Sequence, residues 1–270
     1  MTKFSLENGD SVTGLIPAAG RATRLGELPY SKELLPIPAR TDERDRAGIR
    51  LAIENSVRFL LECGIRHQHV IIAPSKQDIP AHLGDGERLG ASIDYTGIVD
   101  SPSVPHSLDA AFDSVAGRNV VLVFPDIMFE PRAEIAEFFS AQTPSDVDIL
   151  LALVPSTRGD KVDMVSLADD GLVDTVVPKP GTGTCGWTWV AAAWSPRFSR
   201  FMHQFLKESG PGHAPAADSE LYVADVINAA IENGLVCQAR KFADGTAIDI
   251  GTPGDFAAAW RQKSPGDAER

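Results

Sequence analysis

A segment near the amino end combines small residues and cations at a spacing that suits phosphate binding. The apolar run from Val12 to Ile16 is too short for a helix, which predicts a buried strand. Residues 18–24, AAGRATR, follow it, and their small side chains let backbone N–H groups approach an anion closely. Arg24 adds a planar, permanently charged fork, and Lys32, eight residues later, adds a second cation. The segment is therefore predicted to handle phosphate.

Two aspartates follow predicted strands that are far apart in the chain. Asp126 comes after the apolar run 120–124, and Asp249 comes after Ala247 and Ile248. Two carboxylates at strand ends can hold one Mg²⁺, a hard cation that usually takes one or two carboxylates together with phosphates. An aspartate that closes a strand is otherwise a turn former or a helix cap, and position alone favours that plainer role.

The first half of the chain alternates between the two kinds of element. Short apolar runs predict strands at 12–16, 69–73, 93–98, 120–124 and 147–154. Helical spacing predicts helices over 49–63, over 107–116 with Ser107 as N-cap, and over 133–141. This alternation predicts an α/β, Rossmann-like fold with a mostly parallel central sheet flanked by helices. Ligands of such sheets bind beyond the carboxyl ends of the strands, where the first loop and Asp126 would lie.

From Lys161 onwards the pattern changes. A hairpin is predicted over 162–177, followed by a strand over 187–194, helices near 196–207, 221–233 and 253–262, and strands at 236–242 and 247–250. There is no linker composition and no internal repeat. We therefore expect one domain over residues 1–270, with a core of about 11–155 and a smaller C-terminal β/α elaboration of about 156–262.

Composition narrows the class of partner. The chain has 270 residues and a net charge of −12, which argues against nucleic acid or an anionic membrane as partner. Its three cysteines are far apart and lack metal-ligand spacing, as expected for reduced thiols. No apolar run reaches transmembrane length, and the amino end does not read as a signal peptide. These features favour a cytoplasmic protein.

The order of these motifs resembles the signature of the sugar-1-phosphate nucleotidylyltransferases, or nucleotide-sugar pyrophosphorylases, and most of all the glucose-1-phosphate thymidylyltransferase branch. That signature is a strand, a Gly-rich loop ending Thr-Arg-Leu, and a Ser-Lys-x-Leu-Leu-Pro stretch. The positions that fit are Gly20, Thr23, Arg24, Leu25, Lys32, Leu34, Leu35 and Pro36. The chain also has the family's Asp-x-Gly-Thr-Pro motif at 249–253, whereas Asp126 follows Pro125 where the family usually has glycine.

The resemblance implies a Mg²⁺-dependent nucleotidyltransferase that condenses a nucleoside triphosphate of dTTP or UTP type with a sugar 1-phosphate. Residues 11–155 would bind the nucleotide and 156–262 the sugar phosphate. Arg24 and Lys32 would be catalytic, and Asp126 and Asp249 would hold the metal. The nucleotide would lie against Ala18, Ala19, Gly20, Arg21, Ala22, Thr23 and Ser107. The acceptor would contact Asp163, Lys179, Gly186, Trp187 and Glu220. Because many relatives are dimers or tetramers, a homo-oligomer is also compatible with the resemblance.

Departures from the family pattern cluster at the acceptor end. Pro178 replaces the glutamate that precedes the family's lysine, and Val162-Asp163 replaces a Tyr-Gly. The resemblance therefore does not imply which nucleobase or which sugar this chain would bind. Asp163 could face a cationic group, which leaves open a CTP-type enzyme with an amino-bearing phosphate acceptor. Two further alternatives are a metal-dependent glycosyltransferase, with Asp146-Val147-Asp148 as its Asp-x-Asp motif, and a non-catalytic nucleotide-sugar sensor.

Overall fold

A computed structural model describes residues 11–20, 24–39, 48–99, 101–141, 146–209 and 220–261. Arg21, Ala22 and Thr23, which the sequence assigns to the nucleotide loop, lie outside the described residues.

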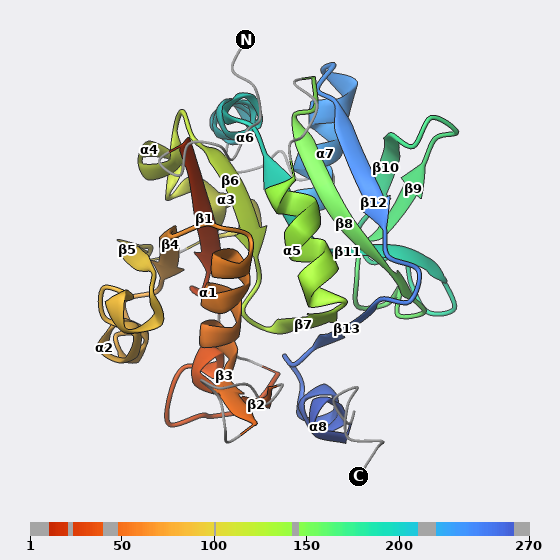
Figure 1. Ribbon diagram of the computed structural model, residues 1–270. Coiled ribbons are helices and arrows are strands. Elements are labelled where there is room, and N and C mark those ends of the chain that lie inside the picture. Colours follow the sequence, from red (N-terminus) through yellow and green to blue (C-terminus); the bar gives the residue numbers. More distant parts are fainter. Residues whose placement is uncertain are drawn as a thin grey trace.

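A central sheet organises the molecule (Figure 1). In the described part of the chain it has nine strands: seven in the order β10-β9-β11-β6-β1-β4-β5, with β8 beside β11 and β12 beside β8. The strands are β1 (Val12–Pro17), β4 (His67–Ile72), β5 (Ser92–Gly97), β6 (Asn119–Val123), β8 (Ile149–Ser156), β9 (Met164–Leu167), β10 (Val173–Val177), β11 (Gly186–Trp194) and β12 (Cys237–Lys241). Seven of these strands run parallel to one another, and β10 and β11 run antiparallel to them. The predicted mostly parallel α/β sheet is confirmed.

Helices cover both faces of the sheet (Figure 1). One face carries α1 (Ala52–Glu62) and α5 (Arg132–Ser140), and α2 (Asp78–Leu83) follows β4. The opposite face carries α3 (Val104–Asp109), α4 (Phe112–Val115), α6 (Pro196–Ser209) and α7 (Val223–Glu232). Side chains alternate along each strand, so β1 sends Ile16 into the core beneath α1 and Leu15 into the core beneath α3. Burial on both faces explains why these strands are continuous apolar runs.

Two small sheets stand at the edge where the parallel strands end. One pairs β2 (Pro36–Pro38) with β3 (Ile49–Leu51), and the other pairs β7 (Ile127–Glu130) with β13 (Thr246–Asp249). The last helix, α8 (Pro253–Arg261), packs on both through a small core that includes Ile37, Ile250 and Ala259. Two 3-10 turns, Lys32–Leu34 and Glu87–Leu89, complete the described elements. These sheets bring the carboxyl-terminal part of the chain to the first loop.

Two sequence predictions need correction. Ser107 is not an N-cap: it lies inside α3, which begins at Val104 after Ser103, and the predicted helix is split into α3 and α4. The physical reason is Pro105, which is favourable in the first turn of a helix and starts α3 earlier than the cap residue suggested. Ile49 belongs to β3 rather than to the following helix, which begins at Ala52. The other predicted elements are present with small shifts of their ends.

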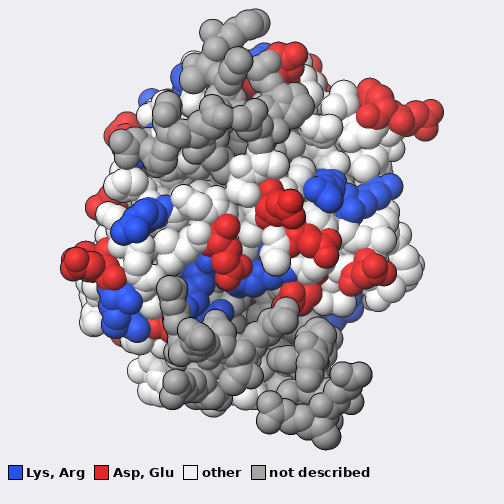
Figure 2. Space-filling view, viewed as in Figure 1, with Lys and Arg blue, Asp and Glu red and all other residues white. Residues whose placement is uncertain are grey.

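The face that carries α1 and α5 mixes charges of both signs (Figure 2). Arg132 of α5 donates to Glu62 of α1 over 2.6 Å and to the side chain of Asn55 over 2.8 Å, which ties the two helices together.

In the part of the chain that the structure describes, none of the helices has the length and hydropathy needed to span a bilayer.

Candidate functional site

Asp126 and Asp249 are neighbours because β7 and β13 pair. Asp249 lies opposite Ile127 in this antiparallel ladder, and the N–H of Ile250 donates to the carbonyl oxygen of Asp126 over 2.8 Å. Burial, together with the negative charge of Asp126, raises the pKa of Asp249 above its ordinary value. Two carboxylates that repel each other are stabilised when a cation lies between them.

The turn after β13 fixes the orientation of the Asp249 carboxylate. Its Oδ1 accepts a hydrogen bond of 2.7 Å from the N–H of Gly251. A Cβ at position 251 would come within 2.7 Å of the same oxygen, so a side chain there would displace the carboxylate. Thr252 then donates to Asp255 over 2.7 Å in the first turn of α8. The Asp-x-Gly-Thr-Pro motif therefore fixes the orientation of the Asp249 carboxylate through Gly251.

Lys32 forms an ion pair with Asp126. Its Nζ lies 2.5 Å from Oδ2 of Asp126. Burial lowers the pKa of Lys32, but the charge of Asp126 and the hydrogen bond to it outweigh burial, so the pKa lies above its ordinary value. The positive charges of Lys32 and Arg24 also act on Asp249, where both favour the ionised carboxylate. The structure thus brings two cations and two carboxylates from distant segments to one place.

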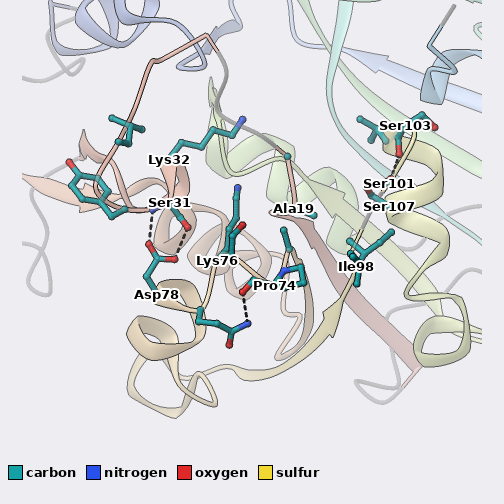
Figure 3. Close-up of a pocket in the computed structure, with 18 of the residues that line it drawn as sticks. Ala19, Ser31, Lys32, Pro74, Lys76, Asp78, Ile98, Ser101, Ser103 and Ser107 are labelled. Carbon is teal, nitrogen blue, oxygen red and sulfur yellow. Dashed lines mark hydrogen bonds between the residues drawn. The ribbon is translucent and has the colours of Figure 1, made fainter.

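The short turn that carries Lys32 is anchored on its outer side. Ser31 donates to the carboxylate of Asp78 twice, through its backbone N–H and through its Oγ, both over 2.6 Å. Asp78 stands at the start of α2, directly after the loop that follows β4. Figure 3 shows this pair beside Lys32. The turn that carries Lys32 is thereby anchored to the start of α2, and Lys32 itself is bonded to Asp126.

A cavity of about 1060 Å³ lies beyond the carboxyl ends of β1, β4 and β5 (Figure 3). Five residues that the sequence singles out line it: Ala19, Gly20, Lys32, Ser107 and Glu220. Ser107 donates from α3 to Oγ of Ser101 over 2.7 Å on the far wall. Ala18 has a different place: it is buried and its N–H donates to the carbonyl of Ile71, so it supports the loop from within the sheet.

The cavity wall contains a buried ion pair that the sequence reasoning missed. Nζ of Lys76 lies 2.7 and 2.8 Å from the two carboxylate oxygens of Glu33. Glu33 is 1% exposed and Lys76 is 8% exposed, and Lys76 lines the cavity. A lysine just after the predicted strand 69–73 was the available signal, because residues after parallel strands face the ligand edge. Nothing local in the sequence identifies Glu33 as its partner.

Replacing Lys76 alone by methionine should lower the free energy of unfolding by about 3–5 kcal/mol, because it leaves the carboxylate of Glu33 buried without its partner. Urea denaturation at pH 7 measures this loss. The double variant Glu33→Gln/Lys76→Met should recover most of it, since a neutral pair has no buried charge. A single variant as stable as wild type would show that Glu33 does not stay buried as an unpaired carboxylate when Lys76 is absent.

A second group of candidate residues lies on the other side of β6. Oδ2 of Asp163 accepts a hydrogen bond of 3.2 Å from Nε1 of Trp189, and the Trp189 ring meets Phe124, two residues before Asp126, edge-on at 5.6 Å. Burial raises the pKa of Asp163, although the Trp189 hydrogen bond and the charge of Lys179 act against it. Asp163 therefore faces a cation that the chain itself supplies.

Lys179 is placed with strain. Its φ of 41° lies in the left-handed region that side chains other than glycine rarely adopt, and its Nζ lies 4.3 Å above the ring of Tyr222. Backbone strain of this kind clusters at functional sites.

Gly186 and Trp187 are the first two residues of β11, and the ammonium of Lys241 lies 5.1 Å above the Trp187 ring. Asp163, Lys179, Gly186 and Trp187 are not among the described residues that line the cavity.

Asp148 stabilises the local structure at the sheet edge opposite to the one where Asp126 lies. It precedes β8 and accepts hydrogen bonds from Ser195, Arg197 and the N–H of Val236, at 3.1, 2.8 and 3.1 Å. Because β8 runs parallel to β6, its start lies at the edge away from Asp126. The Asp-x-Asp match at 146–148 is therefore not at the ligand edge.

The donor set suits a hard divalent cation that also takes ligands from a substrate. Among the described residues, no group of three or more His, Cys, Asp or Glu side chains is placed to hold a metal. Asp126 directly precedes β7, and Asp249 pairs with Ile127 across the β7–β13 ladder, so the two carboxylates come from adjoining positions. Mg²⁺ commonly binds through one or two carboxylates plus phosphates. The residues present fit that ion.

Comparison with known proteins shows the fold. The sequence matches no protein-family model, and the search of curated proteins gives no match either. Among solved structures, the chain is similar to a Bacillus anthracis protein provisionally assigned as a glucose-1-phosphate thymidylyltransferase, in complex with sucrose. The TM-score is 0.75 at 20% identity, over 94% of this chain and 97% of that one.

It is also similar to the UTP-bound UGPase of Acinetobacter baumannii, with a TM-score of 0.66 at 17% identity, over 92% of this chain and 91% of the other. Both neighbours are matched over nearly their whole length, so the agreement extends over both halves of this chain. The chain therefore has the fold of the sugar-1-phosphate nucleotidyltransferases, as the resemblance in its sequence implied.

Proposed function

We propose that the protein transfers a nucleotidyl group from a nucleoside triphosphate to a sugar 1-phosphate and releases pyrophosphate. The observation that carries the proposal is the meeting of Lys32, Asp126 and Asp249 at the carboxyl edge of the sheet. These residues come from three distant segments, and the cavity lined by Lys32 lies beside them. The names of the two structural neighbours, a thymidylyltransferase and a UTP-bound enzyme, support a pyrimidine triphosphate as donor.

The reaction is an in-line displacement at the α-phosphorus. An oxygen of the acceptor phosphate forms a bond to that phosphorus, and the bond between the α-phosphorus and its β-bridging oxygen breaks, so pyrophosphate leaves with the bonding electrons. The acceptor phosphate has a second pKa of about 6 and arrives largely ionised. A general base is therefore unnecessary, and positioning and neutralisation of charge supply the catalysis.

Each residue then has a task. Lys32 and Arg24 stabilise the negative charge that develops on the phosphates, and the loop through Ala19 and Gly20 cradles the nucleotide. Asp126 and Asp249 would hold Mg²⁺, which neutralises charge on the reacting phosphates when bound. Lys179 would anchor the acceptor phosphate. In this scheme residues 11–155 bind the donor and residues 156–262 bind the acceptor.

A screen of pyrophosphate release tests the proposal. The common nucleoside triphosphates are incubated with a panel of neutral and amino-substituted sugar 1-phosphates and Mg²⁺. We expect release that requires both substrates, with dTTP or UTP as the best donor. The variant Lys207→Ala changes an exposed lysine on α6 and should behave as wild type.

Two results would overturn the proposal. Triphosphate binding without turnover of any acceptor would indicate a sensor. Consumption of a nucleotide-sugar with release of a nucleoside diphosphate would indicate a glycosyltransferase.

A further inference from the structure

Lys76 presents a second ammonium group to the cavity. Its side chain comes from the loop after β4, whereas Lys32 comes from the 3-10 turn after the first loop. In Figure 3 the two side chains lie on one wall of the cavity. Both lysines line the same cavity. The wall therefore presents two ammonium groups, and ammonium groups donate charge-assisted hydrogen bonds to phosphate oxygens.

Glu33 bonds to Lys76 on the side away from the cavity. Glu33 is 1% exposed and does not line the cavity, so a ligand would meet the ammonium and not the carboxylate. A lysine ammonium carries three N–H donors. Among the described residues Glu33 is its only hydrogen-bond partner, at 2.7 and 2.8 Å, so one donor is left for a ligand. Burial lowers the pKa of Lys76, and the charge of Glu33 acts against this.

The two lysines differ in their distance from the carboxylate pair. Lys32 touches Asp126 and responds to the charges of both Asp126 and Asp249. Nζ of Lys76 bonds to Glu33 instead, and among the described residues it makes no hydrogen bond to Asp126 or Asp249. If the α-phosphate reacts beside Asp126 and Asp249, the phosphates near Lys76 are those further along the polyphosphate.

We propose that Lys76 is a second polyphosphate-binding residue of this cavity, aimed by Glu33 at the β- and γ-phosphates that leave as pyrophosphate. The inference rests on the proposed function, because it assigns a residue to the donor of that reaction. It makes Lys76 a determinant of selectivity for nucleoside triphosphates over monophosphates. Glu33 is a positioning residue in this scheme, since it acts through Lys76.

Binding measured by titration calorimetry tests this assignment. The ligands are UTP, UMP and inorganic pyrophosphate, each with Mg²⁺, and dTTP with dTMP replaces UTP with UMP if the screen favours it. The central variant is Glu33→Gln/Lys76→Met, which removes the ion pair as a unit and so avoids a buried unpaired charge. It should weaken UTP and pyrophosphate binding at least about tenfold and UMP binding less than about twofold.

A control variant separates ligand contact from loss of structure. Lys207→Met removes a lysine charge far from the cavity and should bind as wild type. Thermal unfolding of each variant establishes that it is folded.

The outcomes are distinguishable. If wild type binds UTP and the double variant binds it equally well, or if UMP and UTP weaken together, the assignment of Lys76 is wrong and the proposed function stands. If wild type binds no nucleoside triphosphate at all, the proposed function fails and the assignment fails with it.

Discussion

Replacing Lys32 by methionine should lower the rate of pyrophosphate release by about 10²–10³-fold, the usual effect of removing one donor from a charge-stabilising site. The fold should survive, because the partner that loses its cation, Asp126, has a side chain that is 23% exposed and can be solvated. This contrasts with Lys76, whose partner Glu33 is fully enclosed. Steady-state rates with saturating substrates, together with a thermal unfolding curve, measure both effects.

The matched control for Lys32 is Lys207→Met, which removes an exposed lysine of α6. It should leave both rate and stability unchanged. A folded Lys32→Met protein with near-normal pyrophosphate release would remove Lys32 from the mechanism.

Asp249→Asn should abolish most turnover, by about 10²-fold or more, without lowering stability. Burial and the charge of Asp126 raise the pKa of Asp249, so the neutral form is the one that the fold prefers. The group therefore contributes stability below its ordinary pKa of 3.8, and that contribution is lost as the pH rises through the raised value. Asparagine keeps an oxygen for the Gly251 N–H and has no charge to repel Asp126.

Urea denaturation as a function of pH checks the second half of this prediction. The stability of wild type relative to Asp249→Asn should fall as the pH rises through the interval just above 3.8. Asp244→Asn, a change at an exposed aspartate, is the control and should keep both this pH dependence and the activity. An Asp249→Asn protein that turns over normally would exclude the carboxylate from the reaction.

These two predictions share a physical feature. The carboxylates and lysines at the edge of the sheet are arranged for a ligand that carries many negative charges and a counter-ion. Burial, and then the negative charge of Asp126, raise the pKa of Asp249, so its ionised form has a cost in the free protein. Sites that carry such cost commonly serve a function.

The sequence predicted the sheet well because its strands are buried on both faces. Runs such as 120–124 and 147–154 are continuous and apolar, and helices with regular spacing lie between them. Alternation of this kind leaves few topologies. The short β7 was missed because its residues, Ile127 to Glu130, become a strand only through β13, far along the chain.

The site residues were predicted from motifs, but their convergence was not. Lys32, Asp126 and Asp249 each belong to a recognisable local pattern, whereas the contact between them depends on the pairing of β7 with β13. Lys76 and Glu33 belong to no such pattern, and only tertiary packing makes them partners. Ser107 shows the converse: a local cap rule failed because Pro105 set the start of the helix.

The most direct test of the central claim is a crystal structure of the protein with UTP or dTTP and Mn²⁺, in which anomalous scattering locates the metal. We expect a manganese peak that takes oxygens from Asp126, Asp249 and the triphosphate, with phosphate oxygens within hydrogen-bonding distance of Lys32. Triphosphate bound elsewhere on the molecule, or seated in the cavity with Lys32 and both aspartates turned away from it, would contradict the account.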